Sequence, residues 1–236
     1  MTKRFLIIFA AALLVTAVPA FAGPAPIVQT LTFGPNTPDM TKTLTFNKFN
    51  DYGGAYTLNS IQVLFNLTSS GGQLILDNDS AEPASGTFAF GARGNISSTD
   101  VGLLKTGLIT PVVAQLNATY SSSFSLSGDP NPVLHDYNPD PNDGMLYIGV
   151  TEFDDDSGFI ASILFPGYIG TGTYNIDASV IQWSTFGGVS GIEYAVTPVS
   201  ANGEVTVIYN YTVPEPATIS LLCIGTLALL KRKSSK

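Results

Sequence analysis

The sequence contains a single cysteine and a single histidine among its 236 residues. Cys223 lies in an apolar run near the C-terminus, so no disulfide can stabilise the body of the chain. The lack of a second histidine excludes a multi-histidine zinc site, and the lack of a cysteine in the body excludes a Cys–His pair there. A serine triad would have to use His135, and no G-x-S-x-G elbow precedes a helix. We therefore do not expect an enzyme.

Basic residues are also scarce. Six of the ten Lys and Arg residues lie at the two ends of the chain, which leaves four within residues 23–212 beside seventeen acidic residues. A body this acidic repels nucleic acid and anionic lipid, but it can attract divalent cations. We expect no nucleic-acid partner.

The first 22 residues have the parts of a secretory signal peptide. Two basic residues and an apolar run from Phe5 to Val18 precede an A-x-A cleavage site at Ala20 and Ala22, directly before Gly23. We expect residues 1–22 to be removed on export. A permanent N-terminal membrane helix is the alternative.

Residues 213–236 combine a proline triplet, an apolar run and a basic tail. Pro214, Glu215 and Pro216 can neither continue a central strand nor lie inside a helix, because proline lacks an N–H donor and has a fixed φ. The run 217–230 is apolar all round a helical wheel, and it rises about 21 Å against about 30 Å of hydrocarbon. We expect a single membrane helix there, with a snorkelling, cytoplasmic basic tail.

This ending resembles the PEP-CTERM sorting signal of bacterial surface proteins. In that family an exosortase, a membrane-embedded cysteine protease or transpeptidase, is believed to recognise the Pro-Glu-Pro region and to release the protein from a transient anchor. The resemblance implies that Pro214, Glu215 and Pro216 are recognition residues of an exosortase substrate. It also implies a transient inner-membrane anchor and a final place at the cell surface or in the extracellular matrix. An ordinary tail anchor is the alternative.

Period-two alternation dominates residues 23–212, which we expect to form a single domain. Many short segments of this kind, separated by Gly, Pro and Asn turns, indicate an all-β sandwich of the jelly-roll or immunoglobulin-like kind. Roughly ten strands are expected, at residues 28–33, 41–46, 61–68, 73–76, 87–90, 112–116, 120–126, 146–150, 174–180 and 205–211. We expect no helix in the body.

Short β-rich strings are spread over most of residues 25–212. They include VQTLTF (28–33), LNSIQV (58–63), LILDN (74–78), YIGTGTY (168–174) and VTVIYNYT (205–212). In these strings the body resembles the choice-of-anchor E family, a domain that accompanies several alternative sorting tails. The family has no defined biochemical activity, so the resemblance assigns no catalytic residue. Residues 129–165 are longer and more acidic than expected of the family.

Oxygen-bearing side chains concentrate between residues 136 and 156. The hard ligands that calcium prefers are supplied by Asp136, Asn138, Asp140, Asn142, Asp143 and Asp154. The spacing is not that of an EF-hand, because Pro141 stands where the turn glycine should be. A calcium site and a solvated, mutually repelling acidic loop both fit the pattern, and no other cofactor is expected. Paired carboxylates for glycoside hydrolysis are arithmetically possible here, but nothing singles out two of them.

These features predict a secreted or cell-surface structural or interaction protein, processed by an exosortase and forming part of an extracellular polysaccharide or biofilm matrix. The alternative is a carbohydrate-binding or calcium-assisted adhesion module. Its candidate sugar-stacking aromatics are Tyr52, Tyr56, Tyr137 and Trp183. A secreted hydrolase is the third hypothesis.

Overall fold

The computed structural model describes residues 24–132, 142–187 and 190–214, and within these ranges it has eleven strands and one short 3₁₀ helix. The strands are β1 (Ile27–Asn36), β2 (Met40–Asn47), β3 (Thr57–Ser70), β4 (Gln73–Asn78), β5 (Ala84–Ser97), β6 (Leu116–Leu126), β7 (Gly144–Ile148), β8 (Glu152–Phe159), β9 (Thr173–Gly187), β10 (Ile192–Thr197) and β11 (Ser200–Thr212); the helix is η1 (Ser162–Tyr168). The all-β class expected from the sequence is confirmed.

The expected signal peptide and membrane helix lie outside the described residues. No helix in the described part of the chain is long and apolar enough to cross a membrane.

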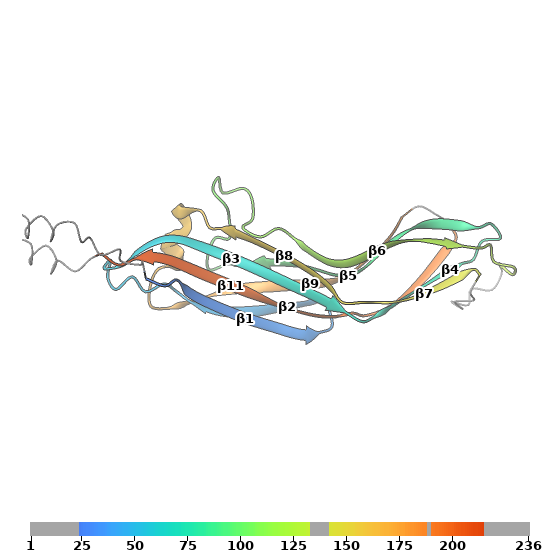
Figure 1. Cartoon of the computed structure of the whole chain (residues 1–236), viewed down its shortest axis with the longest axis horizontal. Helices are drawn as coiled ribbons and strands as arrows, with labels where there is room; N and C mark the ends of the chain where they lie inside the picture. The colour runs from blue at the N-terminus through green and yellow to red at the C-terminus, as the bar shows by residue number, and fades with distance from the viewer. Residues whose placement is uncertain (1–23, 133–141, 188–189, 215–236) are drawn as a thin grey trace, which may run out of the picture. The chain divides into compact units, whose positions relative to one another are not determined.

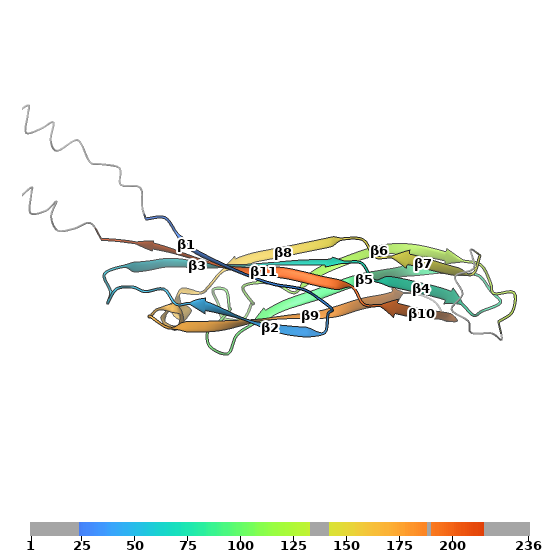
Figure 2. The ribbon, with the colours of Figure 1, turned by 90° about the horizontal axis from the view of Figure 1, so that it is seen from below.

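The strands form three sheets in two layers (Figures 1 and 2). One layer is the four-stranded sheet β2-β9-β5-β6. The other contains the four-stranded sheet β1-β11-β3-β8 and the three-stranded sheet β10-β4-β7. Only two or three residues join β3 to β4, β7 to β8 and β10 to β11, and the strand order is the same on both sides of these joints. The second layer is therefore one sheet interrupted across its middle.

Alternating side chains fill the space between the layers. On β3, Ile61, Val63, Phe65 and Leu67 are fully buried, and the residues between them are half-buried on the outer face. Because successive side chains of a strand point to opposite faces, the period of two in the sequence corresponds to the pleat of β3.

The three-stranded sheet also packs on the long sheet β2-β9-β5-β6, and it does so through Tyr147 of β7. Its ring lies 4.9 Å from the ring of Tyr120 on β6, in a stacked geometry, and 5.3 Å and 6.1 Å from the rings of Phe88 and Phe90 on β5. Aromatic pairs at such distances add to the burial of apolar area. Both parts of the second layer thus share one core with β5 and β6.

Glycines make the interruption possible. Gly71 and Gly72 have φ values of 68° and 74°, which glycine adopts without the steric cost of a Cβ. The amide of Gly149 donates to the carbonyl oxygen of Gly72 at 3.0 Å, and a Cβ on Gly149 would overlap the carbonyl oxygen of Gly71. The ring of Phe90 lies beneath both, 3.0 Å and 3.1 Å from where a Cβ on Gly72 or Gly149 would stand.

Some expected strand positions are wrong. Residues 112–115 are irregular, and β6 begins only at Leu116, because Val112 and Val113 are buried while the chain crosses toward the other layer. A short apolar run signals burial and does not by itself define a strand. Conversely, the acidic segment 152–159 is strand β8, and residues 192–197 form β10, which the alternation pattern missed.

Two buried tyrosines link the layers. The hydroxyls of Tyr174 on β9 and Tyr209 on β11 lie 2.8 Å apart, and the Tyr209 hydroxyl donates to the carbonyl oxygen of Asn47 at 3.1 Å. Tyr174 is therefore the donor to Tyr209. Burial raises the pKa of Tyr209 to about 12 and also raises the pKa of Tyr174, so both hydroxyls stay protonated at neutral pH.

The glycine break predicts unequal costs for two adjacent substitutions. Gly72→Ala should destabilise the fold by about 2–3 kcal/mol, because it imposes a positive φ on alanine and places a methyl group 2.9 Å from the Thr197 carbonyl oxygen. Gly71→Ala has the same backbone requirement but open space around the new methyl group, so it should cost only about 1 kcal/mol. Urea unfolding of the two variants measures the difference, and equal losses would contradict this account of the break.

The tyrosine pair predicts an asymmetry as well. Tyr209→Phe leaves the Tyr174 hydroxyl without its acceptor and the Asn47 carbonyl without this donor, and we expect a loss of about 1–3 kcal/mol. Tyr174→Phe keeps the bond from Tyr209 to Asn47 and should cost about 0.5–1.5 kcal/mol. The unfolding free energies of both variants test which loss is larger. A larger loss in Tyr174→Phe than in Tyr209→Phe would contradict the prediction.

Candidate binding site on the outer face of a sheet

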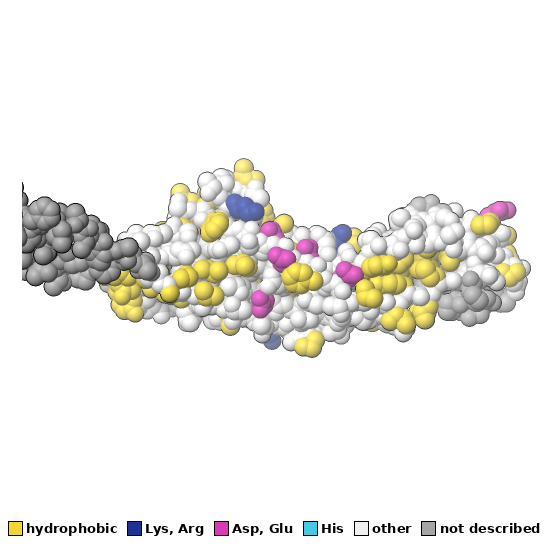
Figure 3. Space-filling model, viewed as in Figure 1, with side chains coloured by type: hydrophobic (Ala, Val, Ile, Leu, Met, Phe, Trp, Pro, Cys, Tyr) yellow, Lys and Arg dark blue, Asp and Glu magenta, His cyan; other side chains and the backbone are white. Residues whose placement is uncertain are grey.

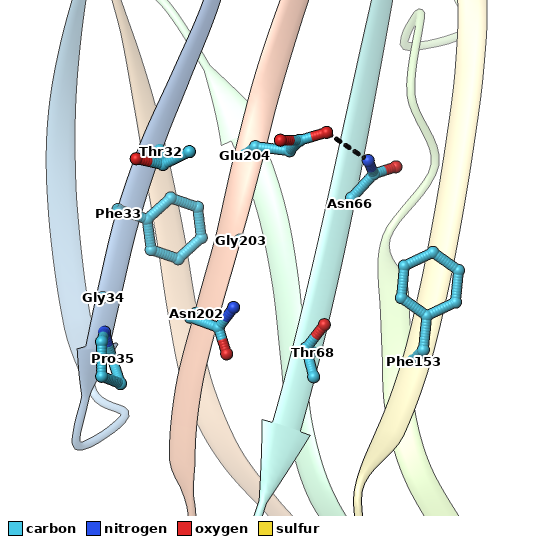
Figure 4. A pocket seen from close by; sticks show the side chains of 10 residues that line it. All are labelled: Thr32, Phe33, Gly34, Pro35, Asn66, Thr68, Phe153, Asn202, Gly203 and Glu204. Carbon is cyan, nitrogen blue, oxygen red and sulfur yellow. Dashed lines mark hydrogen bonds between the residues drawn. The ribbon is translucent and has the colours of Figure 1, made fainter.

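A hollow of about 330 Å³ lies on the outer face of the sheet β1-β11-β3-β8 (Figure 4). All four strands contribute to it. Its lining residues are Thr32, Phe33, Gly34 and Pro35 from β1, Asn202, Gly203 and Glu204 from β11, Asn66 and Thr68 from β3, and Phe153 from β8.

The strand register brings these side chains together. Thr32 pairs with Glu204 across β1 and β11, and the Asn66 amide nitrogen donates to a Glu204 carboxylate oxygen at 2.8 Å. On the other side of β3, Phe153 pairs with Thr68. Since paired residues in a sheet project from the same face, Thr32, Glu204, Asn66, Thr68 and Phe153 share the outer face.

A bulge in β1 opens one end of the hollow. Pairing with β11 is regular as far as Phe33 and Gly203 and resumes at Asn36 and Ala201. Gly34 lies in the interval with a φ of 81°, and a Cβ there would overlap the Ala201 carbonyl oxygen. Glycine is needed here because the φ is positive and the β11 backbone at Ala201 and Asn202 approaches too closely for a Cβ.

The hollow combines neutral polar side chains with the exposed side chain of Phe153 and the apolar side chains of Phe33 and Pro35. Phe153 is 58% exposed. Asn66, Asn202 and Thr68 supply two amides and a hydroxyl, and the amide oxygen of Asn66 points away from Glu204 (Figure 4). Among the ten lining residues only Glu204 is charged. The hollow therefore offers hydrogen bonds and an apolar surface, but its lining holds no pair of carboxylates for acid–base catalysis.

The predicted calcium ligands fall into separate parts of the structure. Outside the described residues lie Asp136, Asn138 and Asp140. Asn142 and Asp143 lie in the turn before β7, where their carbonyl oxygens accept hydrogen bonds from the amides of Ser127 (2.6 Å) and Asn78 (3.0 Å). The whole of β7 and the interruption of the layer separate them from Asp154 in β8. Within residues 24–132, 142–187 and 190–214, no three His, Cys, Asp or Glu side chains form a group suited to a metal ion.

The expectation of a solvated acidic loop is wrong for Asp154 and Asp156. They pair with the buried Leu67 and Phe65 of β3, so their side chains lie on the inner side of the edge strand β8. One carboxylate oxygen of Asp154 accepts the amide of Asn117 at 2.6 Å, and one of Asp156 accepts the amide of Ala114 at 2.6 Å. These carboxylates hold the segment that leads into β6 against the edge of the opposite layer.

The predicted sugar-stacking aromatics lie elsewhere. Tyr52 is 65% exposed and contacts Tyr56, whose ring stacks on Tyr211 at 5.5 Å. The Arg93 guanidinium lies 3.5 Å from the ring centroid of Trp183, so a cation occupies one face of that indole. Tyr137 is outside the described residues.

The hollow was not predicted from the sequence. Alternation along residues 61–68 already placed Asn66 and Thr68 on the polar face of a strand. Phe153 and Glu204 carried no such signal, because their nearness to Asn66 depends on the register of four strands that are distant in sequence.

The expected processing sites are almost entirely outside the described residues. Pro214 is described and exposed after the end of β11. The others, outside the described ranges, are Ala20, Ala22, Gly23, Glu215 and Pro216.

No family model and no curated protein matches this chain. Solved structures with some similarity include the VP2 subviral particle of infectious bursal disease virus, at 14% identity over 79% of this chain and 33% of that chain, with a TM-score of 0.20. The T13 particle of the same virus is similar at 12% identity over 81% of this chain and 36% of that chain, with a TM-score of 0.17. The chain spans about a third of the length of these proteins. A likeness this low identifies neither fold nor function.

The inward carboxylates of β8 predict a stability effect. Asp154→Ala should destabilise the fold by about 1–2 kcal/mol, because the Asn117 amide loses its acceptor. Asp155→Ala is the matched control: its side chain is exposed on the outer face, and we expect a change within about 0.5 kcal/mol. Urea unfolding compares the two, and equal effects would show that the Asp154 hydrogen bond is unimportant.

Proposed function

We propose that this chain is an exported, non-catalytic protein of the cell surface or extracellular matrix, and that its sandwich is a structural and interaction module within a polysaccharide matrix. The observation that carries this proposal is the open hollow on a sheet face, lined by one exposed aromatic ring, one carboxylate and the neutral polar side chains of Thr32, Asn66, Thr68 and Asn202. Such a surface suits contact with an extended, hydrated polymer better than enclosure of a small substrate.

The two ends of the chain support export and sorting. Residues 1–22 have the pattern of a signal peptide, and residues 213–236 resemble a PEP-CTERM signal. In this proposal the chain crosses the inner membrane, is held briefly by residues 217–230, and is processed by an exosortase that recognises the Pro-Glu-Pro triplet.

The packing of the body suits a location outside the cell. Its stability comes from a continuous apolar core and not from disulfides, since the only cysteine lies in the C-terminal tail. The acids of β8 also favour a non-catalytic role. Asp154 and Asp156, which a hydrolase could have used, are already engaged by backbone amides.

A carbohydrate-binding module is the second candidate, and the same hollow favours it. Calcium-assisted adhesion has less support, because Asp143 lies in the turn before β7 whereas Asp154 lies in β8, beyond the interruption of the layer.

The sorting proposal predicts a processing defect. Replacing Pro214, Glu215 and Pro216 together with alanine should leave a membrane-bound species of higher mass, because the exosortase would lack its recognition element. Immunoblotting of membrane and extracellular fractions measures the mass and the location. The wild-type chain in exosortase-deficient cells should accumulate the same species and is the control. An alanine variant processed and located like the wild type would overturn the proposal.

A further inference from the structure

The packing of the core does not explain why Phe153 is exposed. It lies on the outer face of β8, directly beside Thr68, and the residue is 58% exposed to solvent. Phe159 lies on the same face of the same strand with a similar exposure, 56%, but it pairs with Gln62 and does not line the hollow. Of these two phenylalanines, only Phe153 is both exposed and surrounded by hydrogen-bonding side chains.

The charges around the hollow select against anions. Glu204 lines it, and Asp155, which pairs with Asn66, is exposed on the same face. Figure 3 shows acidic side chains gathered over the middle of this face. The basic residues of the body lie on β2, on β5 and in connecting segments, at Lys42, Lys48, Arg93 and Lys105. A phosphate or a polyuronate would therefore be repelled, whereas an uncharged ligand would not.

The polar groups of the hollow match a polyhydroxylated ligand. Sugar hydroxyls both donate and accept hydrogen bonds, and the amides of Asn66 and Asn202, the Thr68 hydroxyl and the Glu204 carboxylate supply both kinds of partner. The hydrogen bond from Asn66 to Glu204 holds these two side chains in place before a ligand arrives, which lowers the entropic cost of binding. The apolar face of a sugar ring can pack on the ring of Phe153.

The hollow also favours a chain over a single sugar. Its lining reaches from Thr32 on β1 to Phe153 on β8, across four neighbouring strands. Three strand spacings of about 4.8 Å amount to roughly 14 Å, which exceeds the length of one sugar ring.

We infer that this hollow binds a stretch of neutral polysaccharide, with Phe153 stacking on a sugar face and Asn66, Asn202 and Glu204 binding hydroxyls. The inference rests on the proposed matrix function and names the ligand class for it.

Affinity electrophoresis of the full chain in detergent tests the inference, with soluble neutral glucans, galactans and mannans in the gel and a polyuronate and a polycationic glucosamine polymer as comparisons. At least one neutral polymer should retard the protein. Phe153→Ala should weaken that binding about tenfold, whereas Phe159→Ala should stay within about twofold. Retardation by no neutral polymer, or equal binding by the two variants, would overturn the inference.

Two further measurements separate the ligand classes. Asn66→Ala should weaken binding and Gln62→Ala, on the same face of β3, should not, with thermal melting used to verify that both variants are folded. Binding should be equal at low and high salt, because an uncharged ligand is not screened. Loss of binding at high salt, or retardation by the polycation alone, would show instead that Glu204 attracts a cation. Normal exosortase processing of a chain that binds no polysaccharide would overturn this inference and leave the sorting proposal standing.

Discussion

The ring of Phe90 lies beneath the interruption of the second layer, and the backbones that cross above it at Gly72 and Gly149 have no room for a Cβ. The sheet β2-β9-β5-β6 contains strands of 14 and 15 residues, and the twist of a sheet accumulates along strands of this length. A second layer that covers such a sheet has to follow the twist or break. Here it breaks at glycines, and each part then packs separately on the long sheet.

The open edge of the sandwich depends on carboxylates. β8 is an edge strand, and inward-pointing charges are one way in which proteins prevent edge strands from pairing with other chains. At this position Asp154 and Asp156 accept hydrogen bonds from the amides of Asn117 and Ala114, so the edge is also covered by the chain's own backbone. Asp154 and Asp156 therefore have a structural role that requires no bound cation.

The sequence predicted the class of the fold and the interior of several strands, because period two is visible wherever one face is buried, as along β3, β9 and β11. It did not predict β8, since aspartate is uncommon in strands and its inward position depends on partners in another segment. The Gly71–Gly72 pair was recognisable as a turn, but β3 and β4 continue in one layer and do not form a hairpin. The hollow was invisible for a similar reason: Thr32, Asn66, Phe153 and Glu204 meet only through register.

The edge strand and the hollow both depend on the register of β8 against β3. Because successive side chains on β8 alternate between faces, the register that turns Asp154 toward the inner side also turns Phe153 outward beside Thr68. A slip of one residue would exchange the two faces, removing the acceptor of the Asn117 amide and the aromatic wall of the hollow together. The hydrogen bonds of Asp154 and Asp156 act against such a slip. Asp154, one of the residues that suggested a calcium site, is therefore better understood as a group that helps to fix the position of the proposed sugar-stacking ring.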